Sequence, residues 1–378
     1  MSDVIDLLAE MVRIPSVNPG DRAPEGPYEG ESRMAPFVHR YLTDRGIECE
    51  LQTMVPGREN VIARVPGTSP GPPLVMETHM DTVAVADMCI EPFDPRPDAE
   101  RVWGRGACDA KSQLAAMMTA LVRVAEGDPP PQDCVLVAAV DEEYGHGGVR
   151  RYLQDAPQVA GAIIGEPTRL RVVVAHKGAF RPRLITRGVS AHSSNPANGV
   201  SAIYKMAHII TALEGYAGML AQRQPHPLVG GPALSVGTVR GGTAVNVVPD
   251  CCEAMVDRRL VPGETVDGVW EEIRAWLAEN TPDDADYEMI STLSDSPVET
   301  SPEQPVVKRA QMAARAVHGD DGIYGVPYGS DASDFRDAGV PVVVCGPGDI
   351  AQAHTADEWV AVAQVEMAAD LYELFLRG

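Results

Sequence analysis

Basic residues are scarce in this sequence. Lysine and arginine together number 31 against 54 acidic residues, which leaves a formal net charge of -23 over 378 residues. Such an excess of negative charge disfavours nucleic acid and anionic membrane surfaces as partners. It also means that a negatively charged substrate would need its own local arginines.

Long apolar runs and paired cysteines are also missing. No uninterrupted apolar run approaches the roughly 20 residues that a membrane helix needs, and the start lacks the basic and apolar regions of a signal peptide. The seven cysteines are scattered and form no CxxC pair, which is atypical of a disulfide framework. We expect a reduced, cytoplasmic protein whose thiols fill core positions. Cys108 could be an exception to this packing role, because it is next to Asp109 in the sequence.

The first half of the chain alternates between short apolar runs and segments with helical periodicity. Strands are predicted at 60–65, 74–76, 135–140 and 162–164, and helices at 4–12, 32–45 and 111–124. This alternation predicts an α/β layer with a mainly parallel sheet. Ligands of such sheets collect beyond the carboxyl ends of the strands.

The pattern changes after Lys177, where strands with period two become common. Strands are predicted at 180–186, 233–240, 244–248 and 252–260, with helices at 202–213 and 266–277. The α/β pattern then resumes with a helix at 306–317, a strand at 339–345 and a helix at 360–376. A chain of this length favours two domains. We predict a catalytic domain from residues 1–177 and 293–378, and an inserted α+β lid or dimerisation domain from residues 178–292.

The pair Glu142–Glu143 follows the predicted strand 135–140 directly. Neighbouring residues at a strand end point in different directions, so one carboxylate can hold a metal while the other faces substrate. Considered alone, the pair would more often be a solvated loop edge, since acidic residues are mostly exposed. The functional interpretation depends on the residues at the other strand ends.

Those other strand ends supply imidazole and carboxylate groups. The additional candidates are His79, Asp81, Asp109, Glu166 and His354. Two histidines with several carboxylates and no thiolate cluster suit zinc or cobalt better than calcium or magnesium. Each residue also has an ordinary alternative: His79 as a core histidine, Asp109 as the cap of the helix at 111–124, Glu166 as a turn residue and His354 as a surface histidine.

The order of these separated motifs resembles the M20 metallopeptidase family, which includes acetylornithine deacetylases, succinyl-diaminopimelate desuccinylases, aminoacylases and carboxypeptidase G-type enzymes. The resemblance spans nearly the whole chain and implies a catalytic domain of the di-zinc exopeptidase type with an inserted lid. It implies two divalent ions bridged by Asp109. His79 and Glu166 would complete one ion's site, and Glu143 and His354 the other's. It also implies a cis peptide bond after Asp109.

The resemblance assigns further roles near the metals. Asp81 would hold the ring of His79 by accepting its other N–H, and Glu142 would be the general base. His192, within the lid-like stretch 188–194, would stabilise the oxyanion from the partner subunit of a homodimer formed through the lid domain. The alternative for His192 is a neighbour of a helix cap.

The substrate-binding residues follow less directly. Asn246 resembles the lid asparagine near the substrate, and Arg259 lies where the family places an arginine that grips a carboxylate. The alternative for Arg259 is an ordinary structural arginine. Lys177 is a further candidate, and Ser330 lies in a stretch that lines the family's pocket floor.

Residues 346–359, with Ala-His followed by Asp357–Glu358, resemble the acetylornithine deacetylase branch most. We therefore predict hydrolysis of an N-acyl, and in particular an N-acetyl, amino acid. A metallo-carboxypeptidase or dipeptidase and an N-succinyl amino-acid desuccinylase are alternatives on the same scaffold. A third alternative is a metal-dependent binding protein without catalysis, against which the presence of Glu142 argues.

Overall fold

The computed structural model describes residues 2–156 and 158–378. It forms two compact units. The first contains residues up to Val174, together with Thr300–Tyr324 and Ser330–Gly378; the second contains Ala175–Glu299 and Gly325–Gly329. The domain boundaries predicted from the sequence, at 177/178 and 292/293, stay a prediction.

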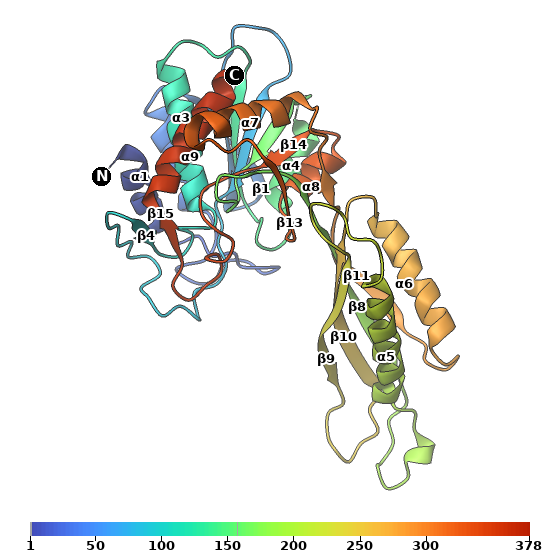
Figure 1. The fold of residues 1–378 in the computed structure, drawn as a ribbon. Helices are drawn as coiled ribbons and strands as arrows, with labels where there is room; N and C mark the ends of the chain where they lie inside the picture. Colours follow the sequence, from blue (N-terminus) through green and yellow to red (C-terminus); the bar gives the residue numbers. More distant parts are fainter. Residues whose placement is uncertain (1, 157) are drawn as a thin grey trace. The chain divides into compact units, whose positions relative to one another are not determined.

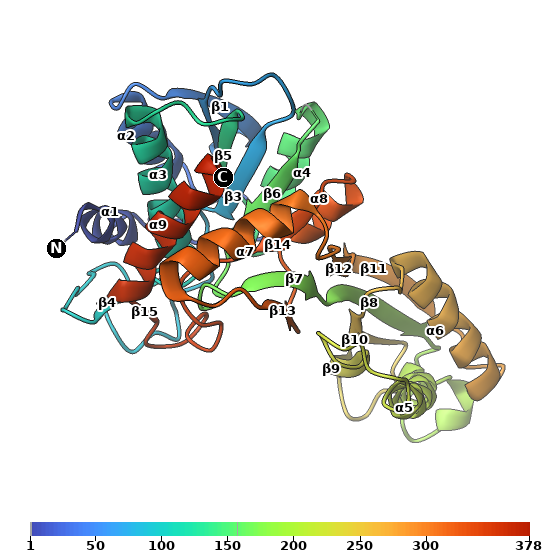
Figure 2. The ribbon, with the colours of Figure 1, turned by 45° about the horizontal axis from the view of Figure 1, so that its top comes forward.

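The first unit is built on a mixed sheet (Figures 1 and 2). Its strands run in the order β1 (Glu48–Val55), β2 (Arg58–Val65), β5 (Cys134–Ala139), β3 (Leu74–His79), β6 (Gly161–Ile164), β14 (Val342–Val344) and β7 (Val172–His176). The last two residues of β7 belong to the second unit, where they pair with the short β12 (Val298–Glu299). The pairings β5–β3, β3–β6 and β6–β14 are parallel, and those at both edges are antiparallel. The prediction of an α/β fold with a largely parallel central sheet is confirmed.

Helices cover the sheet on both faces. They are α1 (Asp3–Val12), α2 (Met34–Thr43), α3 (Lys111–Glu126), α4 (Gly147–Asp155), α7 (Pro305–His318), α8 (Ala332–Asp337) and α9 (Val362–Arg377). Helix α3 packs on β3, β5 and α9, while α7 packs on β6 and β14 (Figure 2). The central strands are buried along their whole length, which explains why they are almost continuously apolar in sequence.

Three further short strands belong wholly or partly to the first unit. β4 (Arg101–Trp103) pairs with β15 (Trp359–Ala361) in a two-stranded ribbon, and β13 (Ile323–Val326) pairs with β7. Across residues 2–156 and 158–378, no helix is both long enough and apolar enough to cross a membrane.

The second unit is an antiparallel sheet with helices packed against it. The strand order is β11 (Glu288–Asp295), β8 (Gly178–Arg187), β10 (Cys251–Leu260) and β9 (Ala233–Gly241), and the helices are α5 (Ala202–Leu220) and α6 (Val266–Asn280), with a 3-10 turn at Pro196–Asn198. Every second residue of β10 is buried, as a half-covered sheet requires. The hydroxyls of Ser201 and Thr265 cap α5 and α6 by accepting backbone N–H groups. This unit therefore has the α+β architecture that was predicted for the inserted domain.

Several predicted elements differ from the structure in type or bounds, and three of the differences concern strands. Residues 244–248 were predicted as a strand but form a turn, in which Val247 N donates to Ala244 O. Gly242, with φ +75°, turns the chain away from the sheet just before it. The strand predicted at 339–345 shrinks to Val342–Val344, because Val340 N still bonds back to Phe335 O at the end of α8. Residues 360–361 belong to β15, so the last helix begins at Val362.

Candidate metal centre

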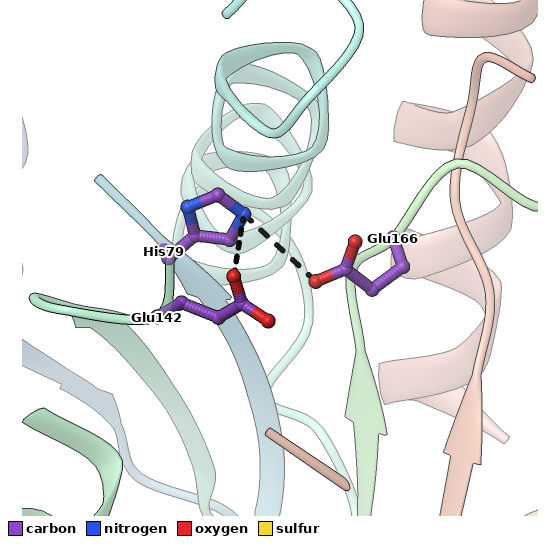
Figure 3. Close-up of side chains that lie close together, drawn as sticks. All are labelled: His79, Glu142 and Glu166. Carbon is purple, nitrogen blue, oxygen red and sulfur yellow. Dashed lines mark ion pairs between the residues drawn. The ribbon is translucent and has the colours of Figure 1, made fainter. Parts of the chain in front are cut away.

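The carboxyl ends of adjacent strands bring the candidate residues to one edge of the sheet. His79 ends β3, Glu142 and Glu143 follow β5, and Glu166 follows β6. Parallel strands deliver their carboxyl ends to the same edge, so residues far apart in sequence become neighbours. Figure 3 shows Glu142 and Glu166 reaching the same ring nitrogen of His79.

Two imidazoles face the carboxylate of Asp109. His79 Nε2 lies 3.2 Å from Asp109 Oδ1, and His354 Nε2 lies 3.4 Å from Asp109 Oδ2. His79 Nε2 is also 3.8 Å from Glu166 Oε1, and His354 Nε2 is 3.2 Å from Glu143 Oε2. Two ligands of one tetrahedral zinc ion lie about 3.3 Å apart, given bond lengths near 2.0 Å. The two oxygens of Asp109 could thus serve two ions, one on each side.

The acidic groups around this centre are buried and crowded. Asp109 is 6% exposed and Glu166 5% exposed. Burial, followed by the charges of neighbouring acids, raises the pKa of Glu166 well above its usual range. Burial also raises the pKa of Glu142, although His79 and His146 oppose the shift. Hydrogen bonds to Asp109 and Glu143 raise the pKa of His354 to about 10. Buried carboxylates at this density require cations or protons between them, and the donor set fits divalent metal ions.

Asp81 contacts both the imidazole of His79 and the backbone N–H groups of Glu142 and Glu143. His79 Nδ1 lies 3.0 Å from the main-chain oxygen of Asp81 and 3.6 Å from its Oδ1. The Asp81 carboxylate accepts hydrogen bonds from Glu142 N at 3.2 Å and from Glu143 N at 3.0 Å. Although burial opposes the shift, the hydrogen bond with His79 helps to lower the pKa of Asp81 to about 2. One ionised carboxylate therefore orients three neighbours at once.

A buried network behind Asp81 was not predicted from the sequence. Asn18 Nδ2 donates to Asp81 Oδ2 at 2.6 Å and to Asp141 Oδ1 at 3.1 Å. Arg58 donates to Asp141 at 2.9 Å and to both carboxylate oxygens of Glu31. Asp141 adopts a left-handed backbone conformation with φ 73°, which these bonds help to hold. No local sequence pattern indicates the network, because its members lie on four separate segments.

A second buried carboxylate, Glu358, holds the segment that carries Asp109. It accepts hydrogen bonds from the backbone N–H groups of Gly106, Cys108 and Asp109, and it pairs with Arg105 at 2.7 Å. The peptide bond between Asp109 and Ala110 is cis, as predicted. The Asp109 side chain does not cap α3, so the capping alternative finds no support.

Cys108 is a buried thiol rather than a reactive one. The residue is fully buried, and its Sγ lies 3.4 Å from the Asp349 carbonyl. Burial raises the pKa of this thiol well above its usual value. A thiol that stays protonated is a poor nucleophile and a poor metal ligand.

Four predicted site residues lie in the second unit. His192 is exposed, and its Nδ1 lies 2.7 Å from Ser194 Oγ. Its backbone bridges to Val247, next to Asn246, so the structure brings these two predicted residues together. Arg259 Nε pairs with Asp257 Oδ1 at 2.7 Å. Lys177 Nζ donates to the Gly231 carbonyl at 2.6 Å.

Ser330 belongs to the first unit and is 2% exposed. Its Oγ lies 3.4 Å from Ala332 N, at the start of α8. This position gives Ser330 a local role in the turn before the helix. Its neighbour Asp331 is equally buried, at 1% exposed.

Comparison with known proteins gives a consistent result. The model of peptidase family M20/M25/M40 matches residues 75–378. The chain is 29% identical over 352 residues to an acetylornithine deacetylase from Aliivibrio salmonicida, covering 89% of each chain. A tripeptidase structure from Staphylococcus aureus superposes with a TM-score of 0.80 at 20% identity, covering 99% of this chain and 97% of that one. An M20 family metallo-carboxypeptidase structure from Sulfolobus solfataricus also has a TM-score of 0.80, at 19% identity, with 100% and 99% covered. At these identities, the two structures establish the fold.

Proposed function

The chain belongs to peptidase family M20/M25/M40, and we propose that it is a dinuclear metal-dependent hydrolase that releases an amino acid from an N-acyl derivative. The observation that carries the proposal is the placement of Asp109 between two imidazoles, with Glu142 beside them. A pure metal-binding protein has no need of an additional, unliganded acid beside the cations, so we prefer a catalyst.

In this proposal the carboxylate of Asp109 would be shared by both ions. His79 and Glu166 would hold one ion, and Glu143 and His354 would hold the other. The distances between these donor atoms support the assignment. Zinc is the ion that we propose, with cobalt as the alternative, because imidazole and carboxylate donors suit both.

Glu142 is the proposed general base. When bound, two divalent ions polarise a substrate carbonyl and acidify a nearby water. Glu142 Oε2 lies 4.0 Å from His79 Nε2. The carboxylate therefore borders the centre but is too far from this imidazole to form a hydrogen bond with it. It would accept the proton from water and pass it to the leaving amine. Asp81, by holding the backbone N–H groups of Glu142 and Glu143, keeps base and ligand in fixed relative positions.

An N-acetyl amino acid is the proposed substrate. The proposal is supported by the sequence of residues 346–359 and by the names of the curated relatives, which are acetylornithine deacetylases at 28–30% identity. The similar tripeptidase and carboxypeptidase structures keep a peptidase as the second candidate. The proposed metal centre would serve either substrate class, since both reactions cleave an amide.

A substrate panel tests this choice. We expect the protein, reconstituted with zinc or cobalt, to hydrolyse N-acetyl amino acids with a higher kcat/KM than N-succinyl amino acids or dipeptides. Release of the free amino acid would be followed by derivatisation of its amine. The metal-free protein serves as the control. A higher kcat/KM for dipeptides would replace the deacetylase proposal by the peptidase one.

We also propose that the chain forms a homodimer through its second unit. Among the described residues, β9 is an edge strand of that unit's sheet and pairs with β10 alone. Apolar side chains are exposed beside it, with Tyr204 at 74%, Val239 at 55% and Val245 at 101% exposure. Ile203, Tyr204 and Val245 also line a surface hollow of about 840 Å³. An unpaired edge next to exposed apolar residues is a suitable surface for a second copy.

His192 is proposed to act on the partner's substrate. Replacing His192 with Ala should lower kcat by roughly 10²–10³-fold if its imidazole donates to the oxyanion. Mixed dimers with an inactive Glu142 variant should regain activity, because one of the two sites would then have both residues. If verified mixed dimers stay inactive, the action across subunits is refuted. His208→Ala, an exposed histidine on α5, is the matched control.

The substrate-contacting roles of Asn246, Arg259, Lys177 and Ser330 remain proposals. Asn246 has the best structural support of the four, since its segment lies next to His192. A cytoplasmic location is likewise proposed. It is supported by the seven cysteines, all of which are free thiols in the structure.

A further inference from the structure

A second group of metal-type donors lies on the other side of Glu142. It consists of Glu142, His146 and Asp331, each of which offers one donor atom within 4.8 Å of the others. His146 Nε2 lies 3.9 Å from Glu142 Oε1, and His146 Nδ1 lies 3.3 Å from Asp331 Oδ1. Neither His146 nor Asp331 belongs to the proposed dinuclear centre. One imidazole and two carboxylates form a donor set that suits zinc.

The imidazole of His146 is held in place by a further carboxylate. His146 Nδ1 lies 2.8 Å from Asp334 Oδ2, and Arg150 Nε donates to the other oxygen of Asp334 at 2.6 Å. Histidines that bind metals usually share one ring nitrogen with a carboxylate, which fixes the orientation of the ring. His146 is 7% exposed and has a left-handed backbone, with φ 54°. The ring is therefore built into the site rather than free on the surface.

Two carboxylates beside His146 are buried with few partners. Asp331 is 1% exposed and Glu77 is fully buried. Within the described part of the chain, none of their four carboxylate oxygens accepts a hydrogen bond, although Asp331 Oδ1 lies 3.3 Å from His146 Nδ1. Leaving buried carboxylates without partners is costly. A divalent cation bound by Asp331 would supply the missing positive charge next to both groups.

We propose that Glu142, His146 and Asp331 form a third, inhibitory site for a divalent cation of the zinc type. A cation bound to Glu142 Oε1, the oxygen nearest His146, withdraws charge from the whole carboxylate. Oε2, which lies 4.0 Å from His79 Nε2, then becomes a weaker acceptor for the proton from water. Because Glu142 also borders the dinuclear centre, repulsion between cations makes the third ion bind more weakly than the first two. Inhibition therefore sets in only when zinc exceeds two equivalents.

The binding part of this inference is independent of the proposed reaction, while the inhibition rests on the proposed role of Glu142. The test begins with equilibrium dialysis of the protein holding two equivalents of zinc against increasing free Zn²⁺. We expect a third equivalent to bind and hydrolysis to fall as it binds. His146→Gln and Asp331→Asn should each keep the first two ions and weaken binding of the third by roughly 10–100-fold. The matched control is His208→Gln, which removes an exposed histidine on α5.

The outcomes separate the site from the proposed function. Absence of a third equivalent in the unmodified protein overturns the inference, as does an unchanged third equivalent in both variants. Full hydrolysis at saturation of the third site overturns the inhibitory role. If no amide substrate is hydrolysed but the third equivalent still depends on His146, the proposed function fails and the cation site stands. If one variant does not fold, the other variant and the stoichiometry of the unmodified protein decide.

Discussion

Replacing Glu142 with Ala is expected to lower kcat by roughly 10²–10⁴-fold, because the water proton then has no positioned acceptor. Glu142 is not among the proposed metal ligands, so the variant should retain both ions. Its carboxylate does border His79, at 4.0 Å, but the imidazole of His79 has closer partners in Asp109 and Glu166. Initial rates on the preferred N-acyl substrate, together with metal analysis of the same samples, measure the two quantities.

The adjacent residue supplies the control. Glu143→Ala should lose metal as well as activity, because Glu143 Oε2 lies 3.2 Å from His354 Nε2 at the proposed second ion site. The two substitutions remove the same chemical group one residue apart. Unchanged turnover in the Glu142 variant would eliminate it as the base. Loss of metal in the Glu142 variant would indicate that it is a ligand instead.

Arg58→Ala is expected to lower the free energy of unfolding by about 3–5 kcal/mol, as removal of one partner from a buried ion pair does. The Arg58 side chain is 6% exposed and that of Glu31 is fully buried. Without the guanidinium, the carboxylates of Glu31 and Asp141 would lie close together with no cation between them. Chemical denaturation of the metal-free protein measures the loss without a contribution from metal binding.

An exposed arginine provides the comparison for this prediction. Arg22 pairs with Glu29 at the surface, where its side chain is 49% exposed. Water and salt screen such a pair, so Arg22→Ala should change the denaturation midpoint much less than Arg58→Ala. Similar losses in the two variants would contradict the view that burial gives the Arg58 network its strength.

The sequence located most of the secondary structure of the first unit because the patterns there are local. Central strands buried on both faces appear as apolar runs, and α1, α3 and α7 carry their apolar residues with helical spacing. The edge strand β1 was missed because its exposed and half-buried residues alternate without a clear apolar side. The error at 244–248 has the opposite cause, since an apolar segment there is largely exposed in a turn.

The candidate metal residues were also identifiable from the sequence, because chemistry restricts their types and parallel strands restrict where they meet. Strand ends on the same edge of a sheet must converge, so His79, Glu142, Glu143 and Glu166 could be grouped before any coordinates were known. Asp109 and His354 are candidates of the same chemical types that do not directly follow predicted strands, and the resemblance to a family implied their roles as ligands. The structure brings all six side chains together.

Only the tertiary structure decided what surrounds these residues. Asn18, Glu31, Arg58 and Asp141 meet behind Asp81, and Glu77, His146, Asp331 and Asp334 meet beyond Glu142. A buried charge is stable only where partners from other segments reach it. The sequence by itself thus determined which groups could bind metal and at which edge of the sheet. The three-dimensional packing determined which charges are paired and which lack a partner, because that depends on distances that no local pattern encodes.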